Sequence, residues 1–270
     1  MHLLGLGADT SVTKMQQLFK NWIFKEKSKL PGKVNLTLQH LASENLAPIV
    51  EGIVQGAVLG RYDIGLYKTT QSKKEGFAAP KASLTFIANA DDNKTLSSAM
   101  RHSEAIAKTQ SSILDLMNAP ANKAKPETLA QWAKDSGKAN GFKVTAFNKS
   151  QCEKKGLHAL LAVNRGSEYP PAFIIMEYRP KKAGRKKLPK IGLVGKGVTF
   201  DTGGLSIKGA TNMHYMKSDM GGAAAVLGTM EACAKLQLPV HLIGIVPTTD
   251  NCVDAMSVKP GDVIDSYSGK

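Results

Sequence analysis

Apolar residues recur along this chain in two alternating patterns, one with the spacing of a helix and one typical of a strand. The helical pattern covers residues 12–24, 43–59, 94–117, 126–137, 150–166 and 219–236, and the strand pattern covers residues 1–7, 33–39, 83–89, 143–147, 172–178, 191–200 and 240–248. Strands that alternate with helices predict an α/β fold with a mainly parallel or mixed sheet covered on both faces.

The Pro- and Asn-rich segment "NAPANKAKP" (residues 118–126) ends the longest helical pattern and is the best candidate for a boundary. With 270 residues the chain is long enough for two domains. We predict a shortened N-terminal α/β domain over residues 1–93 and a linking helix and loop over residues 94–125. A second domain is then expected over residues 126–270.

Composition places the chain among soluble globular proteins, with 42% hydrophobic and 21% charged residues. No apolar run approaches the ~20 residues that a membrane-spanning helix needs, and the first residues carry no basic segment of a secretory signal. We therefore expect a cytoplasmic protein.

The three cysteines, Cys152, Cys233 and Cys252, are widely separated, which predicts neither a disulfide framework nor a thiolate zinc site. Cys233 is expected in the core.

The formal net charge is +14, and residues 201–270 contribute −2 of it. Much of the basic excess lies in "RPKKAGRKKLPK" (residues 179–190), which holds seven basic residues and no acidic one. This segment lies between two strand patterns, so we expect a solvated loop. The alternative is a basic nucleic-acid-binding protein, whose salt-dependent binding would be lost on neutralising Lys181, Lys182, Arg185, Lys186 and Lys187.

The stretch "GKGVTFDTGGLSIKGATNMHYMKSDMGG" (residues 195–222) brings charges and glycines together after a strand pattern. Asp201 follows that strand, and Gly203 and Gly204 permit a turn in which backbone approaches a ligand closely. Sites in α/β sheets form at the carboxyl ends of strands. Lys196 interrupts a strand that reads as buried, so it needs either a carboxylate partner or the loss of its proton.

Other interpretations of these charges are simpler. Asp219 precedes a helical pattern and would serve equally well as its N-cap. Lys208 and Lys217 would serve as solvated surface lysines, and for Lys217 this is the favoured interpretation. The chain contains no G-x-x-x-x-G-K-[ST], no helix-opening G-x-G-x-x-G, no H-E-x-x-H and no G-x-S-x-G. These absences argue against the common phosphate-binding, zinc-protease and serine-hydrolase motifs.

The segments "VGKGVTFDTGGLSIK", "MKSDMGGAAAVLG" and "PGDVIDSYSGK" resemble the leucyl (cytosol) aminopeptidases, two-metal enzymes that release N-terminal amino acids. The resemblance is clear over about residues 95–270. It implies a partial N-terminal α/β (macro-like) domain, followed by an incomplete α/β/α catalytic domain of the zinc-exopeptidase type with a mixed sheet. It also implies a homo-oligomer, a hexamer in the family, that acts on peptides with a free N-terminus and prefers leucine-like residues.

The same resemblance implies a role for five residues. Lys196, Asp201 and Asp219 match metal ligands, Lys208 matches the catalytic lysine, and Met216 matches a residue that lines the pocket for the first side chain of the substrate. Two divalent ions are implied, Zn²⁺ or Mn²⁺, with Mg²⁺ as a further option. Carboxylate oxygens suit all three ions, and a lysine ligates a metal only as the neutral amine.

In the family the remaining ligands come from an Asn-Thr-Asp-Ala-Glu-Gly-Arg segment a few residues after the "SGK" match, which here stands at residues 268–270. We therefore interpret the sequence as a fragment and expect these 270 residues alone to be inactive. An incomplete sheet is also expected to leave an apolar face or edge that promotes association. A non-catalytic family member acting through its interfaces is the remaining alternative.

Overall fold

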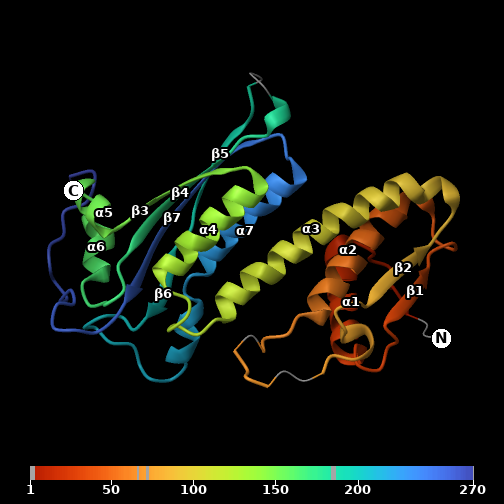
Figure 1. Cartoon of the computed structure of the whole chain (residues 1–270), viewed down its shortest axis with the longest axis horizontal. Helices are drawn as coiled ribbons and strands as arrows, with labels where there is room; N and C mark the ends of the chain where they lie inside the picture. Colours follow the sequence, from red (N-terminus) through yellow and green to blue (C-terminus); the bar gives the residue numbers. More distant parts are fainter. Residues whose placement is uncertain (1–3, 66, 71–72, 184–186, 270) are drawn as a thin grey trace. The chain divides into compact units, whose positions relative to one another are not determined.

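The computed structural model describes residues 4–65, 67–70, 73–183 and 187–269. The chain divides into two compact units, residues 1–112 and residues 113–270 (Figure 1). None of the described helices is both long enough and apolar enough to cross a membrane.

The first unit combines two packed helices with a small parallel sheet (Figure 1). Its helices are α1 (Val12–Glu26) and α2 (Ser43–Arg61), and its strands are β1 (Lys33–Thr37) and β2 (Ser83–Ile87), which pair in parallel. Helix α3 (Asn93–Asn118) begins in this unit and ends in the second. The strand predicted over residues 1–7 is wrong where it can be judged, because residues 4–7 form no strand and residues 1–3 lie outside the described residues.

Helices α1 and α2 pack through direct backbone contact. Gly52, Gly56 and Gly60 occupy successive turns of α2 on the side that faces α1. A Cβ atom at Gly56 would lie 2.6 Å from the backbone oxygen of Gln16 and 2.8 Å from the backbone nitrogen of Lys20. Real Cβ atoms do not approach backbone atoms so closely, so the three glycines set the distance between the helices.

We predict that Gly56→Ala destabilises the first unit. Alanine favours a helix by about 1 kcal/mol over glycine, but overpacking against backbone costs about 1–3 kcal/mol. The expected net loss in the free energy of unfolding is therefore up to about 2 kcal/mol. Urea unfolding followed by Trp22 fluorescence, in a background that carries Trp132→Phe, measures it. The control is Gly5→Ala, because a Cβ there meets nothing within 4 Å. An unfolding midpoint equal to that of the control would contradict the backbone contact.

The second unit is a five-stranded mixed sheet with helices on both faces. Its strands are β3 (Lys143–Phe147), β4 (Ala172–Tyr178), β5 (Lys190–Val194), β6 (Gly197–Asp201) and β7 (His241–Asn251), and its helices are α4 (Pro126–Asn140), α5 (Lys149–Lys154), α6 (His158–Asn164) and α7 (Gly221–Leu236). Strands β3, β4 and β7 are antiparallel neighbours, whereas β5 and β6 both pair with β7 in parallel. Three-residue 3₁₀ helices occur in the first unit at Gly76–Ala78 and Ala90–Asp92 and in the second unit at Lys181–Ala183, and a six-residue 3₁₀ helix lies at Met213–Ser218. The predicted α/β class with a mixed sheet is confirmed.

Buried side chains alternate along β4 with less buried ones, so successive residues point to opposite faces of this sheet. Ile174, Met176 and Tyr178 are buried and pack with residues of α4 and α7, among them Leu129 and Leu227. Figure 1 shows α4 and α7 side by side over this face. Cys233 of α7 belongs to the same core, as the sequence predicted.

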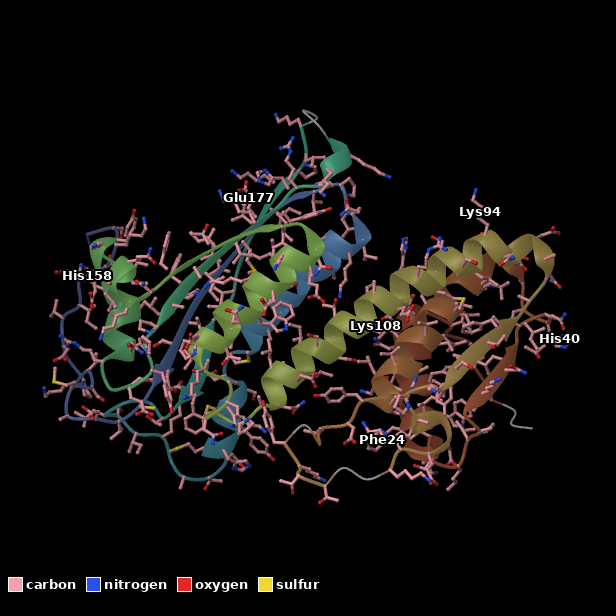
Figure 2. All side chains as sticks on the ribbon, in the orientation of Figure 1. Phe24, His40, Lys94, Lys108, His158 and Glu177 are labelled. Carbon is pink, nitrogen blue, oxygen red and sulfur yellow. The ribbon has the colours of Figure 1, made fainter. Side chains whose placement is uncertain are left out.

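The opposite face of the sheet is covered by α6 and is more open. Phe173 of β4 points to this side and lines a cavity of about 500 Å³ with Leu160 of α6 and Val194 of β5. His158, the first residue of α6, borders the same cavity and is labelled in Figure 2. Val194, the last residue of β5, is 74% exposed on this side.

Two predicted elements are interrupted in the structure. The strand expected over residues 191–200 is divided into β5 and β6 at Gly195 and Lys196, because the first turn of α7 packs against the backbone there. The helix expected over residues 150–166 is divided into α5 and α6, because Gly156 adopts a φ of +67° that ends a helix.

Candidate metal and catalytic site

The charged residues of the "GKGVTFDTGG" segment gather where β6 and β7 end side by side. Asp201, the last residue of β6, is the register partner of Asn251, the last residue of β7. Because β6 and β7 run in parallel, their carboxyl ends lie at the same edge of the sheet. This is the edge at which the sequence predicted a site.

The two oxygens of the Asp201 carboxylate have different partners. Oδ1 accepts hydrogen bonds from the backbone N–H of Gly203, at 2.9 Å, and from Nδ2 of Asn251, at 2.7 Å. Oδ2 accepts from Nζ of Lys208 at 2.7 Å and lies 3.9 Å from Nζ of Lys196. Neutral donors therefore hold one oxygen, and the two ammonium groups face the other.

Asp219 completes the group through Lys196, whose Nζ lies 2.5 Å from Oδ2 of Asp219. The N-cap interpretation of Asp219 is wrong, because α7 begins at Gly221 with Met220 as its N-cap. The expectation of a buried Lys196 is also wrong. Its side chain is 57% exposed, since the break between β5 and β6 turns it out of the sheet toward both carboxylates.

A glycine turn positions Lys208. Gly203 and Gly204 have φ values of +91° and +68°, which the left-handed region permits at glycine. The loop is closed by a hydrogen bond from the backbone N–H of Lys208 to the carbonyl of Thr202, at 2.8 Å. Nζ of Lys208 then lies 2.7 Å from Asp201 and 3.2 Å from Sδ of Met216. The structure thus brings all five residues singled out in the sequence to one place.

Asp201 is held in its ionised form. Burial alone would raise the pKa of Asp201, but hydrogen bonds from Lys208, the Gly203 N–H and Asn251 lower it from 3.8 to about 2. Because the pKa is lower in the folded chain, this carboxylate stabilises the fold above about pH 3.8, and that contribution is lost as the pH falls through about 2.

Two other basic features lie outside this group. Lys217, predicted to be a solvated lysine, instead donates from Nζ to the backbone carbonyl of Asn118 at 3.1 Å, which caps the last turn of α3. In the basic segment, Lys181, Lys182 and Lys187 are exposed between β4 and β5. Arg185 and Lys186 lie outside the described residues.

The donor set fits a divalent ion in part. Within the described parts of the chain, no group of three or more His, Cys, Asp or Glu side chains is placed to hold a metal ion. Asp201 and Asp219 nevertheless supply hard oxygen donors on the two sides of Lys196, whose cationic Nζ already lies between them. The arrangement therefore offers a position for positive charge, with two carboxylates and one amine as candidate ligands.

Asn251 is the residue that sequence reasoning missed. The strand pattern predicts an end at Thr248 and says nothing of strand pairing, so it does not reveal the register that aligns Asn251 with Asp201. The polar run "TTDN" after "IGIVP" indicates this residue, because sites in α/β sheets form at the carboxyl ends of strands and polar residues there often belong to them.

We predict that Lys208→Met raises the pKa of Asp201, because it removes the strongest of the hydrogen bonds that lower this pKa. An NMR titration of the carboxyl carbon in the metal-free chain measures the shift. Lys217→Met is the matched control, since its ammonium bonds Asn118 rather than a carboxylate. An identical Asp201 pKa in the two variants would show that Lys208 does not stabilise the carboxylate.

The catalytic-domain profile of the cytosol aminopeptidase family matches residues 112–270. A probable cytosol aminopeptidase of Chloroherpeton thalassium is 42% identical over 240 residues, which are 86% of this chain and 47% of that protein. Its counterpart in Geobacter sp. strain M21 is 38% identical over 269 residues, which are 99% of this chain and 53% of that protein. The chain thus spans about half the length of the curated relatives it matches.

Solved structures show the same relationship. A mutant of tomato leucine aminopeptidase superposes with a TM-score of 0.84 at 27% identity and covers 99% of this chain and 51% of that one. The bottromycin maturation enzyme BotP in complex with Mn gives a TM-score of 0.79 at 28% identity over 98% of this chain and 53% of that one. The family profile, the relatives and the shared fold agree that the chain belongs to the cytosol aminopeptidase family.

Proposed function

We propose that this chain carries part of the active site of a metal-dependent aminopeptidase that releases leucine-like N-terminal residues from peptides. The observation that supports the proposal is the convergence of Lys196, Asp201, Lys208 and Asp219 at the carboxyl end of β6. Two bound divalent ions, Zn²⁺ or Mn²⁺ with Mg²⁺ as a further option, would supply a clamp for the substrate and an activated water.

In this proposal Lys196, Asp201 and Asp219 hold the ions. The carboxylate of Asp201 is ionised at neutral pH, because its pKa is lowered to about 2, and Asp219 supplies a second carboxylate beside Lys196. Lys196 has to lose its proton before its amine can ligate, and a neighbouring dication favours that loss. Its exposed ammonium has an open path to release the proton to water. Metal binding is therefore expected to release protons and to strengthen as the pH rises.

Lys208 and Met216 act on the substrate. Nζ of Lys208 lies 2.7 Å from Oδ2 of Asp201, and an ammonium at this position can donate to the scissile carbonyl and stabilise the oxyanion that develops on it. Met216 lies beside Lys208 and is placed to contact the first side chain of the peptide. A flexible thioether suits a leucine-like group.

The wider organisation is proposed on the same basis. Residues 1–93 would form the shortened N-terminal domain, residues 94–125 the link and residues 126–270 the first part of the catalytic domain. The further acidic ligands and an assisting arginine would come from an Asn-Thr-Asp-Ala-Glu-Gly-Arg segment, and the whole protein would assemble as a homo-oligomer. Peptides with a free N-terminus would be its substrates.

We predict that the purified 270-residue chain shows no appreciable hydrolysis of leucine amide with added Mn²⁺. Two carboxylates and one lysine leave two dications without full coordination. Release of ammonia measures the activity, and an active full-length relative assayed in parallel validates the conditions. Turnover near the ~10 s⁻¹ of an ordinary enzyme would contradict the incomplete site.

We also predict that Asp219→Asn weakens Mn²⁺ binding to this chain by at least about tenfold, measured by isothermal titration calorimetry. The amide keeps the shape of the side chain but loses its charge. Asp135→Asn is the control, because that carboxylate accepts only from Gln131 on α4 in the contacts described. Equal Mn²⁺ affinities for the two variants would argue against Asp219 as a ligand.

A further inference from the structure

The Asp201 carboxylate is held by two neutral donors on the oxygen that faces away from the lysines. The Gly203 N–H comes from the turn that follows Asp201, only two residues away, and moves with it. Nδ2 of Asn251 comes from the neighbouring strand, 50 residues away, and donates to Oδ1 at 2.7 Å. Asn251 is therefore the donor that ties the carboxylate to a separate element of the sheet.

The backbone of Asn251 is itself fixed. Both the backbone N–H and Oγ1 of Thr202 donate to the carbonyl of Asn251 at 2.9 Å. On the other side, a Cβ atom at Gly204 would lie 3.2 Å from Oδ1 of Asn251, so only glycine leaves the amide its full space. The turn that carries Gly203 and Gly204 thus packs around the Asn251 side chain.

We propose that Asn251 is a positioning residue for the metal site. It donates to Oδ1 of Asp201 and so holds Oδ2 toward Lys196 and Lys208, the side on which the proposed metal position lies. The inference rests on the proposed function, because it assigns Asn251 a task only if Asp201 is a ligand. Hydrogen bonds to the oxygen opposite the metal are the ordinary way in which proteins orient carboxylate ligands.

The chemical nature of Asn251 suits this task. A carboxamide donates without carrying charge, so it orients the carboxylate without competing as a cation for Oδ2. A lysine or arginine in its place would add a third cation beside Asp201 and oppose metal binding. The Asn251 amide adds a second donor on Oδ1 to the Gly203 N–H, so it further restricts rotation of the carboxylate.

The test measures Mn²⁺ affinity of the 270-residue chain by titration calorimetry in wild type, Asn251→Leu and Asn251→Gln. Asn251→Leu keeps the volume and removes the donor, and we expect a loss of about 10–100-fold in affinity. Asn251→Gln restores a donor on a longer side chain and is expected to recover part of the loss. The matched control is Asn140→Leu, because Nδ2 of Asn140 also donates but to the backbone carbonyl of Ser136, at 2.9 Å. Urea midpoints confirm that each variant is folded.

The outcomes separate the positioning role from the proposed function. If Asp219→Asn abolishes Mn²⁺ binding but Asn251→Leu binds within twofold of wild type, the metal site stands and the positioning role is overturned. Equal losses in Asn251→Leu and Asn140→Leu would also overturn it, since the effect would then be general.

A second measurement applies if wild type binds no Mn²⁺ and the metal proposal itself fails. NMR hydrogen exchange of the Asn251 side-chain amide in the metal-free chain then decides. We expect protection that Asp201→Leu removes, because the hydrogen bond depends on the carboxylate oxygen. Exchange at the rate of a free amide in wild type would overturn the inference.

Discussion

The site depends on a backbone contact between two glycines. A Cβ atom at Gly195 would lie 2.4 Å from the carbonyl oxygen of Gly222, and one at Gly222 would lie 3.0 Å from the backbone nitrogen of Lys196. The contact is completed by a hydrogen bond from the N–H of Ala223 to the carbonyl of Lys196, at 2.8 Å. Because the start of α7 lies directly on the break between β5 and β6, Lys196 and Asp219 are brought together although 23 residues separate them.

Charge balance supports the proposal that these four residues form part of a two-metal site. Two lysines and two aspartates give a group with no net charge when both lysines are protonated, and each carboxylate has an ammonium partner. Two dications would replace one proton on Lys196 and leave an excess of about three positive charges. Further carboxylates, such as those of the proposed Asn-Thr-Asp-Ala-Glu-Gly-Arg segment, would neutralise that excess.

Much of the fold could be predicted because the side chains that are buried in the core recur in the sequence with the period of a strand or a helix. The alternation of β4 and the apolar stripe of α7 face one core, so their periodicity is visible in the sequence. The break at Gly195 was not visible, since β5 and β6 are both strand-like and only the contact with Gly222 separates them. Local pattern cannot reveal a contact between residues that are distant in the sequence.

The sequence predicts some residues of the candidate site and not others. The lysines and aspartates can be singled out because their types and spacing resemble a known family, whereas the place of Asn251 depends on the register of β7 against β6. The prediction that Lys217 is solvated is wrong for a related reason. Its partner is the backbone carbonyl of Asn118 at the end of α3. Any residue type at this position has the same carbonyl oxygen, so the sequence does not indicate the contact.

Glycine contacts serve different purposes in the two units. In the first unit Gly52, Gly56 and Gly60 fix the distance between α1 and α2, whereas the charged residues of the candidate site belong to the second unit. In the second unit Gly195 and Gly222 fix the positions of charged side chains that flank them in sequence. A Cβ at Gly195 or at Gly222 would move Lys196 relative to Asp219 by a few tenths of an ångström or more, and the proposed metal site would tolerate little error of that kind. Glycine at these two positions therefore serves the site as much as the fold.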